Sequence, residues 1–127
     1  MKELNSFSIA ERISSFKYAL NGIRIVLMEE HNFRVHLFAS IIVILLGVFF
    51  QISNLEWCQC LLVIGLVFIA EMVNSTIENL CDYLSLANDS RIGRIKDIAA
   101  GSVLISSVAA FVIGLIVFLP KFFGLFY

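Results

Sequence analysis

Three long apolar stretches dominate this sequence, and they decide what environment the folded chain can occupy. The clearest is the charge-free run from Leu37 to Phe50, which with its apolar flanks approaches the ~20 residues that a helix needs to cross a bilayer. Of the 127 residues, 60% are hydrophobic and 15% are charged, and the mean hydropathy is +0.94. These values are typical of a membrane protein. We therefore expect an all-α membrane protein with transmembrane helices over about residues 33–52, 55–83 and 97–119, the last stopped by Pro120.

A different pattern precedes the first span. Apolar residues recur at helical spacing among charged ones over about residues 7–29, which predicts an amphipathic helix lying in the membrane interface. Its apolar positions are Phe7, Ile9, Ile13, Phe16, Leu20, Ile23 and Leu27. The same face would also suit packing against a neighbouring subunit. No small-residue cleavage site follows a compact apolar core, so we expect no secretory signal peptide and treat residues 1–127 as a single domain.

The distribution of basic residues predicts the orientation of the spans. Arg91, Arg94 and Lys96 lie between the second and third spans, further basic residues precede the first span, and the turn 51–56 has none. The positive-inside rule then places the amino terminus and the loop 85–94 in the cytoplasm and the turn outside. The net charge of −1 offers no basic face for nucleic acid, so we expect no nucleic-acid partner.

The second span carries a polar stripe at its carboxyl end. The apolar run from Leu61 to Ala70 continues into this stripe without a glycine or proline at the junction. On a helix, five of the polar side chains that follow fall into one sector about 100° wide. These are Glu71, Asn74, Ser75, Glu78 and Asp82. Because ionisable side chains are costly to place near a membrane, the stripe is a candidate site for a cation, a proton or a phosphate-bearing ligand.

Neither of the common glycine-rich phosphate loops, G-x-x-x-x-G-K-[ST] or G-x-G-x-x-G, occurs in the sequence. Such a chain would handle phosphate through carboxylate-held Mg²⁺, which commonly takes one or two protein carboxylates plus substrate phosphates. Glu30 and Glu78 would meet this requirement if they came together at the cytoplasmic surface. Lys96 could then neutralise charge on a transferring phosphoryl group. The alternative for Glu29, Glu30 and Arg34 is an ordinary solvated face.

Small residues recur along the third span at steps of four residues, at Ser102, Ser106, Ala110 and Gly114. Such a row allows helices to approach closely in lipid. Since three spans alone enclose a polar site poorly, we expect assembly into a homo-oligomer. Packing of the small residues within one subunit is the alternative.

Three blocks of sequence carry a resemblance to a known family. They are the block from Glu30 to Arg34, the block from Ala70 to Glu78 with Asp82, and the block from Lys96 to Val103. The middle block reads E-x-x-N-[ST]-x-I-E-x-x-x-D, and it is highly specific in combination with the K-D pair that begins the third. Together they resemble the small integral-membrane diacylglycerol kinases and undecaprenol kinases of bacteria. The likeness runs from about residue 16 to residue 121.

The resemblance implies a homotrimer in the bacterial cytoplasmic (inner) membrane, with three transmembrane helices and one surface helix per subunit. It also implies transfer of the γ-phosphate of ATP to a membrane lipid alcohol with Mg²⁺ as cofactor. Glu71 resembles the family's general base, Glu30 and Glu78 its metal ligands, and Asn74 a hydrogen-bonding residue at the reacting centre. Lys96 and Asp97 resemble the family's nucleotide-contacting residues, and Tyr18, Asn88 and Asp89 resemble positions near the nucleotide.

Two features favour undecaprenol over diacylglycerol as the acceptor. Family members acting on diacylglycerol often carry an acidic residue where this chain has His36, and the pattern Arg34-Val35-His36 is closer to the undecaprenol kinase branch. The carboxyl end from Ile113 to Lys121 also resembles that branch.

A non-enzymatic oligomer, such as a small cation or proton pathway built on the Glu71 stripe, is the alternative function. It would need carboxylates through the whole bilayer. The run from Leu61 to Ala70 has no polar side chain, and the third span offers only serines.

Overall fold

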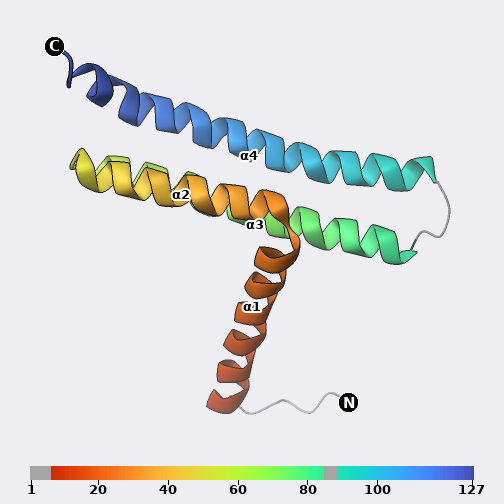
Figure 1. The fold of residues 1–127 in the computed structure, drawn as a ribbon. Helices are drawn as coiled ribbons and strands as arrows, with labels where there is room; N and C mark the ends of the chain where they lie inside the picture. The colour runs from red at the N-terminus through yellow and green to blue at the C-terminus, as the bar shows by residue number, and fades with distance from the viewer. Residues whose placement is uncertain (1–6, 85–88) are drawn as a thin grey trace.

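A computed structural model describes residues 7–84 and 89–127, and within these ranges the chain forms four α-helices. Their bounds are Ile9–Glu29 (α1), His31–Phe49 (α2), Asn54–Leu84 (α3) and Ser90–Phe123 (α4). Helices α2, α3 and α4 run alongside one another, whereas α1 leaves them at a steep angle (Figure 1). Helices α2, α3 and α4 are each long and apolar enough to cross a membrane. The expected all-α architecture is thus confirmed.

The helices differ in length, and the difference positions the site. At ~1.5 Å per residue, the 19 residues of α2 extend about 28 Å, close to the ~30 Å hydrocarbon thickness of a bilayer. The 31 residues of α3 and 34 residues of α4 extend about 46 and 51 Å on the same rise. Both continue past the junction of α1 and α2 (Figure 1). The ends of α3 and α4 nearest the connecting segment therefore project beyond the length of α2.

The α1–α2 junction is a single residue, Glu30. Its backbone is extended, with φ −99° and ψ 112°, and it closes α1 through an N–H bond to the carbonyl of Val26 at 2.8 Å. The same residue is the N-cap of α2, yet its side chain makes no capping hydrogen bond there. One non-helical residue redirects the chain, and it leaves the Glu30 carboxylate available to another element.

The turn between α2 and α3 is tight because Gln51 adopts the left-handed conformation, with φ 50°. The Ile52 N–H donates to the carbonyl of Gly47 at 3.1 Å and the Gln51 N–H to that of Val48 at 3.2 Å, which is a Schellman motif. A Cβ at Gly47 would lie 2.6 Å from the Trp57 ring. Only glycine leaves room for the indole against this turn.

Helix α3 begins with a reciprocal capping box. The Ser53 N–H donates to Glu56 Oε2 at 2.8 Å, and the Glu56 N–H donates to Ser53 Oγ at 3.2 Å. Lys121 Nζ on α4 donates to the other Glu56 oxygen at 2.9 Å. The contact fixes the end of α4 beside the start of α3.

The expectation that Pro120 stops the third span is wrong, because α4 continues through it to Phe123. Proline removes one N–H donor, but at the end of a helix only the last turn is affected. The Pro120 carbonyl still accepts a hydrogen bond from the Gly124 N–H at 3.0 Å. Helix α4 also starts earlier than the expected span, because the Asp89 side chain caps it by accepting the Arg91 N–H at 2.9 Å.

Apolar side chains are packed together mainly at the turn end of the bundle. Ile52, Cys60, Val117 and Phe118 form a buried cluster there, with Trp57 among the side chains packed on it. Elsewhere large apolar side chains stay exposed in the single chain, including Leu62 at 68% and Ile105 at 74%. Apolar surfaces of this extent indicate contact with lipid or with other protein chains.

Candidate active site

The polar stripe of α3 passes from the interior of the bundle to its surface. Glu71 and Ser75 are buried, Asn74 and Glu78 are half-buried, and Asp82 is exposed. This gradient follows the length of α3, whose last turns project beyond α2. The carboxylates therefore lie at different depths, with Glu71 the deepest.

Glu30 joins this stripe from the α1–α2 junction. Its Oε1 accepts a hydrogen bond from Ser75 Oγ at 2.7 Å, although the two residues are 45 positions apart in the chain. The carboxylate that does not cap α2 is thus held against α3. The bond brings Glu30 within one helical turn of Glu78, which lies three residues after Ser75.

Asn74 contacts Glu78, the other residue that the sequence resemblance implies as a metal ligand. Its Nδ2 donates to Glu78 Oε1 at 3.3 Å across one turn of α3. The amide oxygen of the same side chain is buried and has no hydrogen-bond partner among residues 7–84 and 89–127. Asn74 therefore presents an unused acceptor beside a carboxylate.

His36 contacts Glu71 from the facing helix α2. Its Nε2 lies 3.1 Å from Glu71 Oε1, and the side chains are 25% and 3% exposed. Oε1 makes no hydrogen bond within the described part of the chain, so its contact with the imidazole is an electrostatic one. Sequence reasoning used His36 only to choose the acceptor and missed this contact, because no local pattern shows which α2 side chain faces Glu71.

Unpartnered buried oxygens gather around these residues. Within the two described segments, the buried side-chain atoms without a hydrogen bond are Glu71 Oε1, Asn74 Oδ1 and Ser107 Oγ. Leaving such an atom unpaired costs about 1–3 kcal/mol, so buried polar groups normally have partners. The three atoms lie on one stretch of α3 and on α4, and no described residue forms a hydrogen bond with them.

The residues expected to contact the nucleotide are spread over three places. Lys96 pairs with Asp82 at the projecting end of the α3–α4 pair, and Asp97 is exposed next to it. Tyr18 is exposed on α1, where it lines a shallow depression of about 440 Å³ with Lys17 and Arg24. These residues are not joined into one cluster within the chain.

The remaining two such residues precede α4. Asn88 lies outside the described residues. Asp89 caps α4, and hydrogen bonds from the Arg91 side chain and backbone hold the pKa of the Asp89 carboxyl below its usual value. Its contacts in the chain are thus those of a helix cap.

Glu30 and Glu78 fit a Mg²⁺ site of the kind that relies on its substrate. No cluster of three or more His, Cys, Asp or Glu side chains that could hold a metal occurs within 7–84 and 89–127. Mg²⁺ does not require one, since it is commonly bound by one or two carboxylates, several waters and substrate phosphates. Both carboxylates accept hydrogen bonds from neutral groups and form no ion pair within the described residues. Their negative charge is therefore available to a cation.

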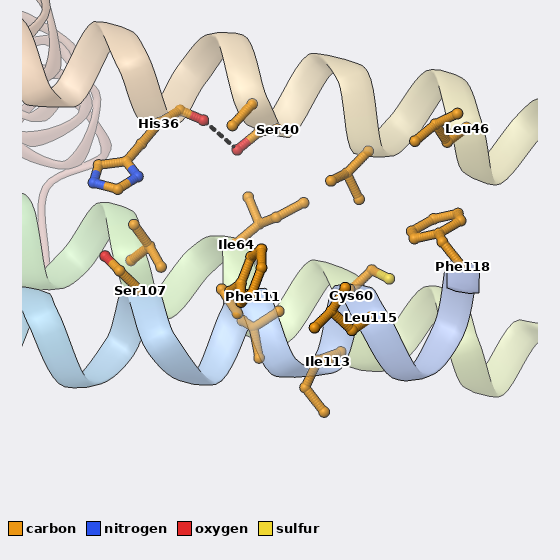
Figure 2. Close-up of a pocket in the computed structure, with 16 residues that line it drawn as sticks. His36, Ser40, Leu46, Cys60, Ile64, Ser107, Phe111, Ile113, Leu115 and Phe118 are labelled. Atoms are coloured by element: carbon orange, nitrogen blue, oxygen red, sulfur yellow. Dashed lines mark hydrogen bonds between the residues drawn. The ribbon is translucent and has the colours of Figure 1, made fainter. Parts of the chain in front are cut away.

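An apolar cavity of about 390 Å³ lies between α2, α3 and α4. His36 and Ser107 lie at one end of it and Leu46 and Phe118 at the other (Figure 2). Most of the remaining lining is apolar, and Gly114 on α4 is part of it. Ala110 and Gly114, two small residues of the row on the third span, thus leave space for the cavity, which begins at the imidazole that contacts Glu71.

Comparison with known proteins identifies the family. Residues 17–118 match the family model described as prokaryotic diacylglycerol kinase. The chain belongs to this family. The resemblance inferred from the three sequence blocks is thereby confirmed, and with it the class of enzyme, a lipid kinase. Family membership does not support the alternative of a non-enzymatic cation or proton pathway.

Named relatives span both acceptor types. The undecaprenol kinase of Bacillus subtilis is 35% identical over 119 residues, which is 94% of this chain and 93% of the relative. A diacylglycerol kinase of Synechocystis sp. is 29% identical over 123 residues, 95% of this chain and 70% of the relative. A diacylglycerol kinase of Haemophilus influenzae is 31% identical over 94 residues, 74% and 80%. The relatives of this chain therefore include kinases named for undecaprenol and kinases named for diacylglycerol.

Proposed function

We propose that the chain is an ATP-dependent lipid kinase that transfers the γ-phosphate to the hydroxyl of a membrane lipid alcohol, with undecaprenol favoured over diacylglycerol. The observation that carries this proposal is the position of Glu71. Its carboxylate is buried and contacts the imidazole at the end of the apolar cavity. A lipid tail in that cavity would bring its hydroxyl to a carboxylate able to accept the proton.

Glu71 acts as the general base in this mechanism. It removes the proton of the acceptor hydroxyl while the alcohol oxygen attacks the γ-phosphorus in line with the leaving oxygen of ADP. General-base assistance contributes about 10²–10⁴-fold, so positioning and electrostatics supply the rest of the rate. The contact with His36 fits this role because it holds the carboxylate toward α2, where the cavity begins.

Glu30 and Glu78 would hold Mg²⁺, with Ser75 and Asn74 orienting them through hydrogen bonds. The ion would supply positive charge that offsets the negative charge of the phosphates. Lys96 offsets charge on the transferring group once it exchanges Asp82 for phosphate. We assign nucleotide contacts to Tyr18, Asn88, Asp89, Lys96 and Asp97.

The composition of the cavity supports undecaprenol as the acceptor. Diacylglycerol brings two ester carbonyls that need hydrogen-bond donors, whereas a prenol brings one hydroxyl on a hydrocarbon tail. Among the polar lining side chains, Ser40 already donates to the His36 carbonyl at 2.7 Å, which leaves His36 and Ser107. A site with few hydrogen-bond donors gains little binding free energy from ester carbonyls. The 35% sequence identity to the Bacillus subtilis undecaprenol kinase agrees with this choice.

We place the enzyme in the bacterial cytoplasmic membrane as a homotrimer, with its amino terminus and active site on the cytoplasmic side. The basic segments and the proposed site lie at the same end of the helices, opposite the base-free turn 51–56. The extensive exposed apolar surface supports burial against both lipid and other subunits. A cytoplasmic site has direct access to ATP.

The test is phosphorylation of separate lipid alcohols by the purified protein with labelled ATP. Labelled undecaprenyl phosphate at a higher kcat/KM than labelled phosphatidic acid supports the proposal. A clear preference for diacylglycerol would overturn the acceptor and leave the kinase assignment intact. Activity retained by Glu71→Gln would remove the proposed base.

A further inference from the structure

Ser107 differs from Ser102 and Ser106, which precede it on α4. Ser102 Oγ donates to the carbonyl of Ala99 at 2.6 Å and Ser106 Oγ to that of Val103 at 2.9 Å. Serines in apolar helices commonly satisfy their hydroxyls on their own backbone in this way. Ser107 Oγ is buried without any hydrogen bond to residues 7–84 or 89–127. Its hydroxyl is therefore unpaired in a place where pairing within the helix was possible.

The register of α3 against α4 places Ser107 at the level of Glu71. The Asp82–Lys96 pair marks one end of the contact between these antiparallel helices. Eleven residues inward from that pair, α3 reaches Glu71 and α4 reaches Ser107. Counting inward from the Glu56–Lys121 pair at the other end, Glu71 on α3 is level with residue 106 on α4, one residue from Ser107. The unpaired hydroxyl thus lies at the depth of the proposed base.

Ser107 and His36 line the same end of the apolar cavity, on opposite helices (Figure 2). The polar side chains there are few, and the Ser40 hydroxyl already donates a hydrogen bond to the backbone carbonyl of His36. A hydroxyl buried in such a lining costs free energy unless something in the cavity pairs with it. An alcohol group at the end of a hydrocarbon tail would do so and would leave the rest of the cavity apolar.

We propose that Ser107 is a specificity-determining residue that binds the hydroxyl oxygen of the lipid alcohol at this end of the cavity. The inference rests on the proposed lipid kinase function and adds a residue that determines how the acceptor is held. The Ser107 O–H donates a hydrogen bond to one lone pair of the alcohol oxygen. The alcohol keeps its own proton, which points toward Glu71, and its second lone pair remains for attack on phosphorus.

The test compares Ser107→Ala with Ser106→Ala in the purified full-length protein. Loss of one hydrogen bond should lower kcat/KM for undecaprenol about 3- to 10-fold in Ser107→Ala, mainly through KM, and leave the KM for ATP unchanged. Ser106→Ala should match the wild type, because Ser106 bonds only its own helix. Ser107→Thr, which keeps the hydroxyl, should restore most of the loss.

Binding without ATP separates this contact from catalysis. The wild type should bind labelled undecaprenol more tightly than the matching hydrocarbon without the hydroxyl, and Ser107→Ala should reduce that preference about 3- to 10-fold. An active wild type whose Ser107→Ala variant keeps both the KM and the preference would overturn the Ser107 assignment alone. Equal losses toward lipid and ATP together with a lower Tm would also overturn it. A wild type that phosphorylates no lipid alcohol would instead overturn the proposed function.

Discussion

His36 Nε2 lies 3.1 Å from Glu71 Oε1, so an imidazole on α2 contacts the most deeply buried carboxylate of the α3 stripe. The contact joins two functions of the site. On one side of the imidazole is the proposed base, and on the other is the cavity proposed to hold the lipid tail. Side chains that orient a catalytic group affect the rate without touching the reacting atoms.

Replacing His36 with leucine should lower kcat for lipid phosphorylation about 10- to 100-fold, since small misplacements of a catalytic group cost this much. The KM for ATP should change little, because the imidazole faces the cavity. The measurement is steady-state kinetics with each substrate varied in turn. His31→Leu is the matched control, because His31 is exposed at the start of α2. Wild-type kcat in His36→Leu would exclude a positioning role.

Periodicity and hydropathy predicted most of the fold. The apolar runs of α2, α3 and α4 and the amphipathic spacing of α1 are local patterns, and a membrane permits few alternatives to helices. The error at Pro120 has a local cause too. A proline in the last turn removes one hydrogen bond and does not prevent the helix from continuing for a few residues.

The site was predictable only along α3. The spacing of Glu71, Asn74, Ser75 and Glu78 places them on one helix face by geometry alone. The contacts of that face with Glu30 and His36 depend on how α2 packs against α3 and on where α1 ends. No local residue pattern shows which side of α2 faces α3. The unpaired hydroxyl of Ser107 was equally hidden, because neighbouring serines of the same type are satisfied by their own helix.

The turn between α2 and α3 should be intolerant of a side chain at Gly47. A Cβ there would lie 2.6 Å from the Trp57 ring and 3.1 Å from Ile52, so Gly47→Ala should destabilise the protein by about 1–3 kcal/mol. Thermal unfolding in detergent measures the change. Gly22→Ala is the control, since a Cβ at Gly22 meets nothing within 4 Å and alanine favours the helix. An unchanged Tm for Gly47→Ala would show that the indole moves aside at no cost.

The orientation of the spans can be tested by thiol labelling in a cysteine-free variant. A cysteine replacing Asn54, the first residue of α3, should react with an impermeant reagent added outside spheroplasts, and one replacing Ser90 should react only after lysis. Asn54 suits the test better than Ser53, whose side chain caps α3. Both chosen positions are exposed. The reverse labelling pattern would put the proposed site outside and separate it from cytoplasmic ATP.

The metal assignment predicts a graded response around Glu30. Glu30→Gln and Glu78→Gln should each raise the Mg²⁺ concentration for half-maximal activity by at least about 10- to 100-fold. Removing a residue that only hydrogen-bonds a metal ligand typically lowers metal affinity by this much. Ser75→Ala removes such a partner, the donor to Glu30 Oε1 at 2.7 Å, so its effect should be smaller and of the same kind. Membrane insertion should remain intact in all three.

Glu29→Gln is the matched control, because Glu29 is the exposed neighbour of Glu30 at the end of α1 and should tolerate the loss of charge. Titration of activity with Mg²⁺ at saturating ATP and lipid separates these variants. Two carboxylates that share one ion should also respond together, so Glu30→Gln combined with Glu78→Gln should abolish transfer. If neither single variant alters the Mg²⁺ dependence, the two carboxylates do not hold the metal, and the hydrogen bond between Ser75 and Glu30 serves only to fix the α1–α2 junction against α3.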